Sequence, residues 1–267
     1  MSTQKRDHSI EFLRVLAIIL IIASHCKILE QGGVGNCIFF ALSGFFIVAP
    51  FKEDTELAFL SPKEWLRYIG KRLLRVLPAY YTYLIAITYL LGLLHVNDFE
   101  TVASLPLHLC FYMASGHLWF IQQEMLFFLL CPLLMCLLGL IRMVLEKRKV
   151  SAAVSDLILA GVLILLCVLS LEFLHIMLHG NNTLVRFMPE RIMAGMVFGY
   201  MVKALRHAFP RLGEQKGMQI LTDGYVILFV LFCLLSSEWV LSRFNPAFAG
   251  YYIGWSNPFL CIILTGI

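Results

Sequence analysis

The chain has 267 residues, of which 60% are hydrophobic and 14% are charged, and its mean hydropathy is +0.82. Soluble domains average about 45–50% apolar and about 25% charged residues, so this composition excludes an ordinary soluble domain and indicates a membrane protein. The formal net charge is only +4, and the basic residues lie in short stretches between apolar runs, so no nucleic-acid partner is expected.

Long apolar runs predict an all-α fold, a polytopic integral membrane helix bundle. A run of about 20 apolar residues is long enough to cross a bilayer as a helix. The last run reaches the end of the chain without a polar tail, so we expect residues 1–267 to form a single transmembrane domain that is incomplete at its C-terminus. About eight membrane helices are expected, near residues 12–29, 34–50, 78–95, 118–141, 153–177, 189–207, 220–241 and 251–267.

The lysine and arginine residues predict the orientation of these helices. With the N-terminus in the cytoplasm, the inner stretches hold 16 of these residues and the outer stretches hold 4, while Arg14 lies within the first span. Cytoplasmic loops carry an excess of basic residues in membrane proteins. We therefore expect a cytoplasmic N-terminus.

The first span contains two polar side chains, Arg14 and His25, eleven residues apart. Eleven residues of α-helix turn by about 20° beyond full turns and rise about 16 Å, so both side chains lie on one face, with Arg14 toward the cytoplasm. An ionisable residue in a membrane helix indicates a functional site by default. A structural role stays open, because Arg14 can pair with Glu11 or extend to the interface, and His25 can be an ordinary interfacial histidine.

The second span contains Ser43 and Gly44 within a bulky apolar segment, residues 39–47. Two small residues at this position are typical of close helix packing. A functional role for Ser43 therefore depends on its context.

Residues 61–77 predict a separate amphipathic helix on the cytoplasmic membrane surface. Ser61, Pro62 and Glu64 fit the N-cap, the first position and the third position of such a helix. Its apolar side chains fall on one side, and four basic residues lie opposite, namely Lys63, Arg67, Lys71 and Arg75. Arg72 lies at the edge of the apolar side, so it should have a partner inside the protein or in a ligand.

Arg72 and Arg75 precede Pro78, which we expect to begin the next span. These arginines can be a positive-inside anchor at the start of a helix. They can also bind phosphates, because a guanidinium group binds an oxyanion through two parallel hydrogen bonds.

The fourth segment contains His117, Trp119 and Glu124. His117 and Glu124 are seven residues apart, so they share a face if one helix contains both. A belt of interfacial aromatic residues accounts for Trp119, but it does not account for a glutamate inside the membrane.

These four segments, in this order, resemble the acyltransferase 3 family of membrane O-acyltransferases. The first span is similar to its Arg-x10-His signature, and residues 39–47 are similar to its Phe-Phe-x-Leu-Ser-Gly-Phe-x-Ile segment. Residues 72–80 match its Arg-x-x-Arg-x-x-Pro-x-Tyr pattern. Residues 117–128 resemble its Trp-x4-Glu-x2-Phe-Tyr segment, with Phe128 where tyrosine is usual. The resemblance covers about the first half of the chain, and the second half matches mainly in hydropathy.

The resemblance implies transfer of an acyl group, with acetyl as the expected case, from acyl-CoA to a hydroxyl of a cell-surface polysaccharide or glycolipid. Histidine suits proton transfer near neutral pH, so His25 is expected to act as general base or as transient acyl carrier. Glu124 and Arg14 are expected beside it in the catalytic centre. Arg72 and Arg75, together with Arg14, are expected to bind the donor. The expected substrate contacts are Ser43, His117 and Trp119.

We expect no permanently bound cofactor and no metal site, with acetyl-CoA as co-substrate. The expected partners are the lipid bilayer, acyl-CoA and a glycan acceptor, and the expected location is the inner or cell membrane of a bacterium. Two alternatives stay open. A multi-span transporter or flippase of an envelope precursor fits the composition and the membrane arginines equally well, and an inactive, truncated relative fits the abrupt end of the chain.

Overall fold

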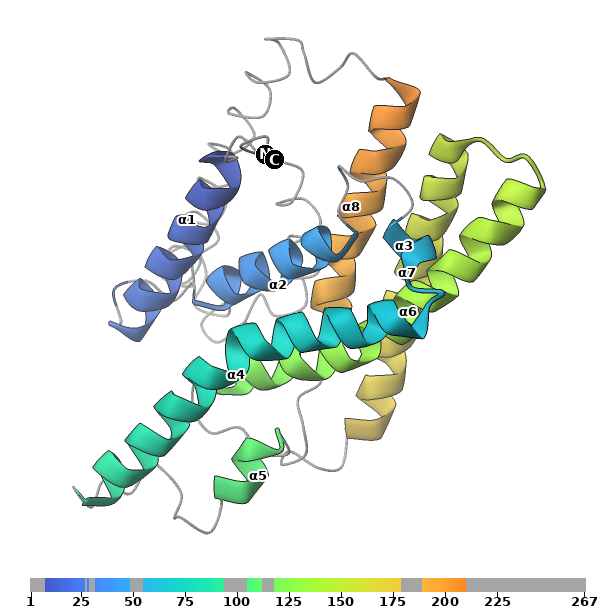
Figure 1. Cartoon of the computed structure of the whole chain (residues 1–267). Coiled ribbons are helices and arrows are strands. Elements are labelled where there is room, and N and C mark those ends of the chain that lie inside the picture. The colour runs from blue at the N-terminus through green and yellow to red at the C-terminus, as the bar shows by residue number, and fades with distance from the viewer. Residues whose placement is uncertain are drawn as a thin grey trace, which may run out of the picture. The chain divides into compact units, whose positions relative to one another are not determined.

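The described part of the chain is entirely helical in a computed structural model (Figure 1). It contains eight α-helices and no β-strand, which confirms the predicted all-α class. The expected spans 220–241 and 251–267 lie outside the described residues. The structure describes residues 8–26, 28, 32–48, 55–93, 105–111, 118–178 and 189–209.

Six of the eight helices overlap expected spans. Two helices are long and apolar enough to cross a membrane among the described residues, namely α6 and the Ala152–Ser170 part of α7, and a shorter apolar stretch covers Gly35–Val48. The expected number of eight membrane helices therefore stays a prediction. In chain order the helices are α1 (His8–His25), α2 (Gly32–Val48), α3 (Thr55–Ala58), α4 (Pro62–Leu93), α5 (Leu105–Leu109), α6 (Trp119–Lys147), α7 (Ala152–Leu178) and α8 (Glu190–Ala208).

Helix α4 corrects the expectation of a separate surface helix over residues 61–77. It begins at Pro62 as expected, but it continues through Pro78 as one helix of 32 residues. A proline inside a helix removes one backbone hydrogen bond and bends the helix, but it need not end it. Packing supports α4 on both sides of Pro78, because Tyr68 contacts the Phe128 ring of α6 and Tyr80 packs with α5 and α6.

The helices belong to two compact units. The first unit contains α1, α2, α7 as far as Cys167, and α8. The second unit contains α3, α4, α5, α6 and the remainder of α7.

In the first unit, close approach of α2 and α8 depends on glycine. A Cβ atom added to Gly44 of α2 would fall on the Ile192 carbonyl oxygen, and one added to Gly195 of α8 would fall on the Ala41 carbonyl oxygen. Small residues at such positions let two helix backbones pack closely. The other side of α2 packs against α1 through a buried apolar cluster, which comprises Leu13, Ala17, Leu20, Ile38 and Leu42.

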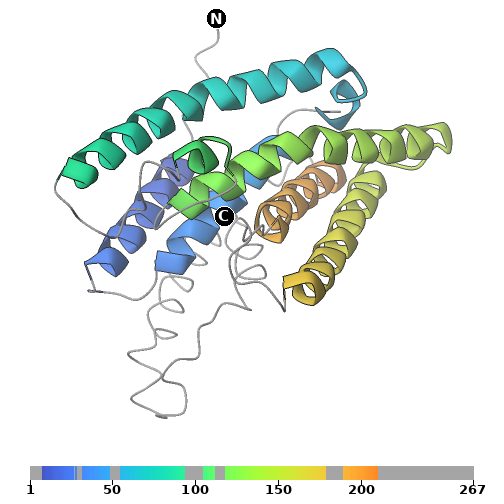
Figure 2. The same ribbon diagram turned by 90° about the horizontal axis from the view of Figure 1, so that it is seen from below.

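In the second unit, α4 and α6 lie side by side (Figure 2). Side chains of α4 and α6 bind carbonyl groups at the end of the short helix α5 and just after it. The Tyr80 hydroxyl donates to the His108 carbonyl at 2.9 Å, and the Gln122 amide donates to the Phe111 carbonyl at 2.7 Å. Phe111 has a φ of 58°, and its ring stacks on the Tyr80 ring at 5.1 Å between centroids. These contacts position the start of α6.

Candidate functional site

Arg14 and His25 lie on one unbroken helix. Helix α1 runs from His8 to His25, so the helical register that places both side chains on one face is present. Both side chains are exposed. The Arg14 guanidinium lies over the Phe46 ring of α2, with 5.4 Å between its central carbon and the ring centroid. This is a cation–π distance, so the α1–α2 contact restrains the arginine.

Ser43 is half-buried in α2, next to the glycine that contacts α8. The close approach at Gly44 confirms a role of this glycine in helix packing. A contact between Ser43 and a substrate stays a prediction.

Arg72 is half-buried and lies against two aromatic rings of the second unit. Its central guanidinium carbon is 4.8 Å from the Phe128 ring centroid and 5.5 Å from the Tyr68 ring centroid. This confirms that Arg72 has a partner inside the protein, and that partner is aromatic. Arg75, one turn further along α4, is exposed.

Tyr68 is a neutral partner for Arg72. It lies in the part of α4 that precedes the expected span, and burial is the largest cause of the upward shift in its pKa. The nearby Arg72 charge acts in the opposite direction without cancelling the effect of burial. The phenol therefore stays protonated near neutral pH, and the contact is between a cation and a neutral ring.

Trp119 and Glu124 lie at the start of α6. Trp119 is its first residue and packs edge-on against Phe120, with ring centroids 6.3 Å apart. Glu124 is half-buried, and its neighbours Gln122 and Gln123 are buried. Two adjacent amides in an apolar run of the sequence indicate a polar site, and the four motifs do not include this signal. His117 lies outside the described residues.

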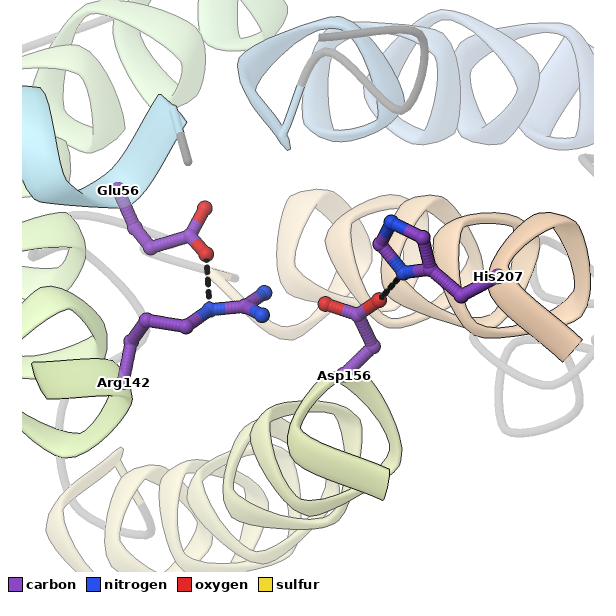
Figure 3. Close-up of polar contacts among 4 residues, drawn as sticks. All are labelled: Glu56, Arg142, Asp156 and His207. Atoms are coloured by element: carbon purple, nitrogen blue, oxygen red, sulfur yellow. Dashed lines mark hydrogen bonds and ion pairs between the residues drawn. The ribbon is translucent and has the colours of Figure 1, made fainter. Parts of the chain in front are cut away.

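Two polar pairs were not predicted, and Figure 3 shows how each is formed. In the second unit, Arg142 Nε lies 2.6 Å from Glu56 Oε1, and both side chains are buried. In the first unit, His207 Nδ1 lies 2.7 Å from Asp156 Oδ2, and the aspartate is fully buried. The partners are 86 and 51 residues apart in sequence, so no local pattern indicates either pair.

The expected site residues fall in both units. The first unit contains Arg14, His25 and Ser43, and the second contains Arg72, Arg75, Trp119 and Glu124. Within the described residues, no group of three or more histidine, cysteine, aspartate or glutamate side chains is arranged to bind a metal ion.

Residues 7–267 match a family model described as an acyltransferase domain, that of the acyltransferase 3 family. The match therefore extends beyond the four motifs and includes the second half of the chain. No curated protein and no solved structure matches the chain significantly.

Proposed function

Because the chain belongs to the acyltransferase 3 family, we propose that it transfers an acyl group from acyl-CoA to a hydroxyl of a cell-surface polysaccharide or glycolipid. Membership of this family makes the chain an acyltransferase with membrane character, and it favours this activity over that of a transporter or flippase. The acyl group that we propose is acetyl. The proposed location is a bacterial inner membrane, with the N-terminus in the cytoplasm.

The observation that supports this proposal most directly is the continuity of α1. It keeps Arg14 and His25 in the register of the family's signature, on one face of one helix and about 16 Å apart along its axis. A helix break between these residues would have removed that relationship. The face offers a cation at the cytoplasmic end and an imidazole at the other end, which suits an anionic donor and a hydroxyl acceptor.

The proposed reaction requires two proton transfers, one to His25 and one from it. His25 removes the proton of the acceptor hydroxyl, and the oxygen attacks the thioester carbonyl carbon. When the carbon–sulfur bond breaks, the CoA sulfur leaves and takes the proton from the His25 imidazolium. The products are an ester and free CoA. In the alternative route, His25 attacks the thioester first and then passes the acyl group to the acceptor.

The other residues have proposed roles that follow from their chemistry. Arg14, Arg72 and Arg75 offer positive charge to the phosphates of the donor. Glu124 is proposed to orient His25 or an intermediate, and this role rests on the sequence motif. The remaining proposed contacts, with the acceptor, are Ser43, His117 and Trp119.

The proposal is tested by transfer of radiolabelled acetyl from acetyl-CoA to envelope glycan in membranes that contain the chain. The test variants are His25→Ala and Arg14→Ala. Cys26→Ala is the matched control for the first, because Cys26 is the adjacent exposed residue. Arg67→Ala is the control for the second, because it removes an exposed positive charge elsewhere.

Incorporation of label by the wild type and both controls, with loss in both test variants, would support the proposed reaction and the role of α1. A His25→Ala variant that folds normally and keeps full transfer would exclude His25 as base and as acyl carrier. Absence of label from a folded, inserted wild-type chain would contradict transfer of acetyl to the glycan.

A further inference from the structure

Arg72 differs from Arg142 and Arg67 in its partners, and from the exposed Arg75 and Arg148 in its burial. The Arg142 charge is balanced by Glu56, and Arg67 lies 3.4 Å from Glu64 on the exposed side of α4. Arg72 has no carboxylate within 4 Å among the described residues, and its contacts are with the Tyr68 and Phe128 rings. It is therefore a half-buried positive charge that contacts aromatic rings and that no acidic group of the described residues neutralises.

The two ring contacts leave some of the hydrogen-bond donors of Arg72 available. A guanidinium group is planar, and its five N–H bonds lie in that plane. Binding of a phosphate uses one edge of the group, where two N–H bonds are parallel. The Tyr68 and Phe128 rings lie at 86° to each other, so the planar guanidinium can stack on at most one of them. The two contacts limit its rotation, and its five N–H donors exceed those that one ring can occupy.

We propose that Tyr68 and Phe128 are positioning residues that hold the Arg72 guanidinium against their rings so that its remaining N–H donors bind a phosphate of the acyl donor. The inference rests on the proposed function, because that function identifies the donor as a CoA thioester. It also gives different roles to the two arginines of the Arg-x-x-Arg pattern, Arg72 and Arg75. Arg72 provides the oriented contact, whereas the exposed Arg75 contributes general positive charge.

The two rings act through their faces and not through polar groups. The Tyr68 hydroxyl is buried and makes no hydrogen bond of good geometry, although the Cys131 thiol and Arg72 lie near it. Phe128 has no hydroxyl, so its contact with Arg72 is made by the ring alone. The inference therefore requires an aromatic ring at each position and tolerates loss of the Tyr68 hydroxyl.

Binding of free coenzyme A tests the inference. The full chain is purified in dodecyl maltoside, a phosphate-free detergent, so that lipid phosphate does not compete, and affinity is measured by calorimetry. Phe128→Leu and Tyr68→Leu remove a ring, whereas Phe128→Tyr and Tyr68→Phe keep it. Phe198→Leu is the matched control, because it removes a ring from the Phe45 stack in the first unit.

Loss of either ring should weaken coenzyme A binding by about 2- to 30-fold, the range that a cation–π contact represents. The two ring-preserving variants and Phe198→Leu should stay within about 2-fold of the wild type. Arg72→Lys should weaken binding at least as much as loss of a ring, because an ammonium group lacks the planar pair of donors. Pantetheine, which lacks the nucleotide and its phosphates, should bind wild type and Phe128→Leu equally.

A double-mutant cycle decides whether the rings act through Arg72. In an Arg72→Ala background, Phe128→Leu should have no further effect on coenzyme A affinity. An equal effect of Phe128→Leu in both backgrounds would overturn the inference, as would unchanged affinity in both ring-removing variants. Failure of the wild type to bind coenzyme A would overturn it as well.

A failure of this inference can be distinguished from a failure of the proposed function, because the double-mutant cycle and the acetyl-transfer assay test them separately. If the wild type transfers acetyl but the cycle shows no coupling, the positioning role is wrong and the enzyme assignment stands. If the cycle shows coupling but no acetyl reaches the glycan, the phosphate site stands and the proposed acceptor is wrong.

Discussion

Glu56 and Arg142 form a buried ion pair that fastens α3 to the C-terminal half of α6. The Nε–Oε1 distance is 2.6 Å, and the relative exposure of the two side chains is 0% and 4%. The backbone of α3 also packs closely on α6, because a Cβ atom added to Gly139 would lie 2.7 Å from the Glu56 carbonyl oxygen. The pair therefore anchors the chain immediately before α4, the helix that contains Arg72.

Removal of one partner of this pair should destabilise the protein strongly. Arg142→Ala leaves the Glu56 carboxylate buried without its cation, which typically costs about 3–5 kcal/mol. SDS-induced unfolding of the purified protein measures the change in the free energy of unfolding. Arg67→Ala, which removes one member of an exposed pair, should change it little. Equal, small effects of the two substitutions would contradict a stabilising role for the buried pair.

Gly44→Ala should disturb the contact between α2 and α8. The added methyl group would meet the Ile192 carbonyl, and backbone has to shift to admit it. Overpacking of this kind costs about 1–3 kcal/mol or more. Gly161→Ala is the matched control, since a Cβ atom there meets nothing within 4 Å, and the higher helix propensity of alanine should make that variant slightly more stable. Thermal unfolding in detergent should show opposite shifts, and shifts of the same sign and size would contradict the close approach.

Tyr80→Phe should loosen α5 from α4. The Tyr80 hydroxyl is the donor to the His108 carbonyl, and the residue is 2% exposed. Loss of the donor removes one of two hydrogen bonds to the His108 carbonyl, which still accepts from the Phe111 N–H, at a cost of about 0.5–1.5 kcal/mol. Proteolysis of the purified protein near residues 105–111 should accelerate. Tyr83→Phe removes a hydroxyl from an exposed position three residues later and should leave the rate unchanged. Equal rates in all three proteins would refute the anchoring role.

His25→Ala should lower the rate of acetyl transfer by about 10²- to 10⁴-fold, because positioned general bases contribute this much to catalysis. The apparent KM for acetyl-CoA should change less than kcat, since the proposed role of His25 is in the chemical step. Initial rates over a range of acetyl-CoA concentrations separate the two parameters. A change confined to KM would show that His25 binds the donor instead.

The positions of the helices were largely predictable, because apolar runs and helical periodicity are local properties of the chain. Helix α1 confirms the shared face of Arg14 and His25, which needed only the helical repeat. The expected end of a helix at Pro78 was wrong. Local preference favours a break there, but α5 and α6 pack against α4 and keep the helix continuous.

The sequence by itself determined the membrane class, the helical fold and the four motifs that indicate an acyltransferase. Only the tertiary structure decided which side chains meet across helices: Arg72 with Tyr68 and Phe128, and Glu56 with Arg142. Hydropathy and periodicity depend on neighbouring residues, so they can be read along the chain. The partner of a buried charge depends on how distant helices pack, and the spacing of residues in the sequence does not contain that information.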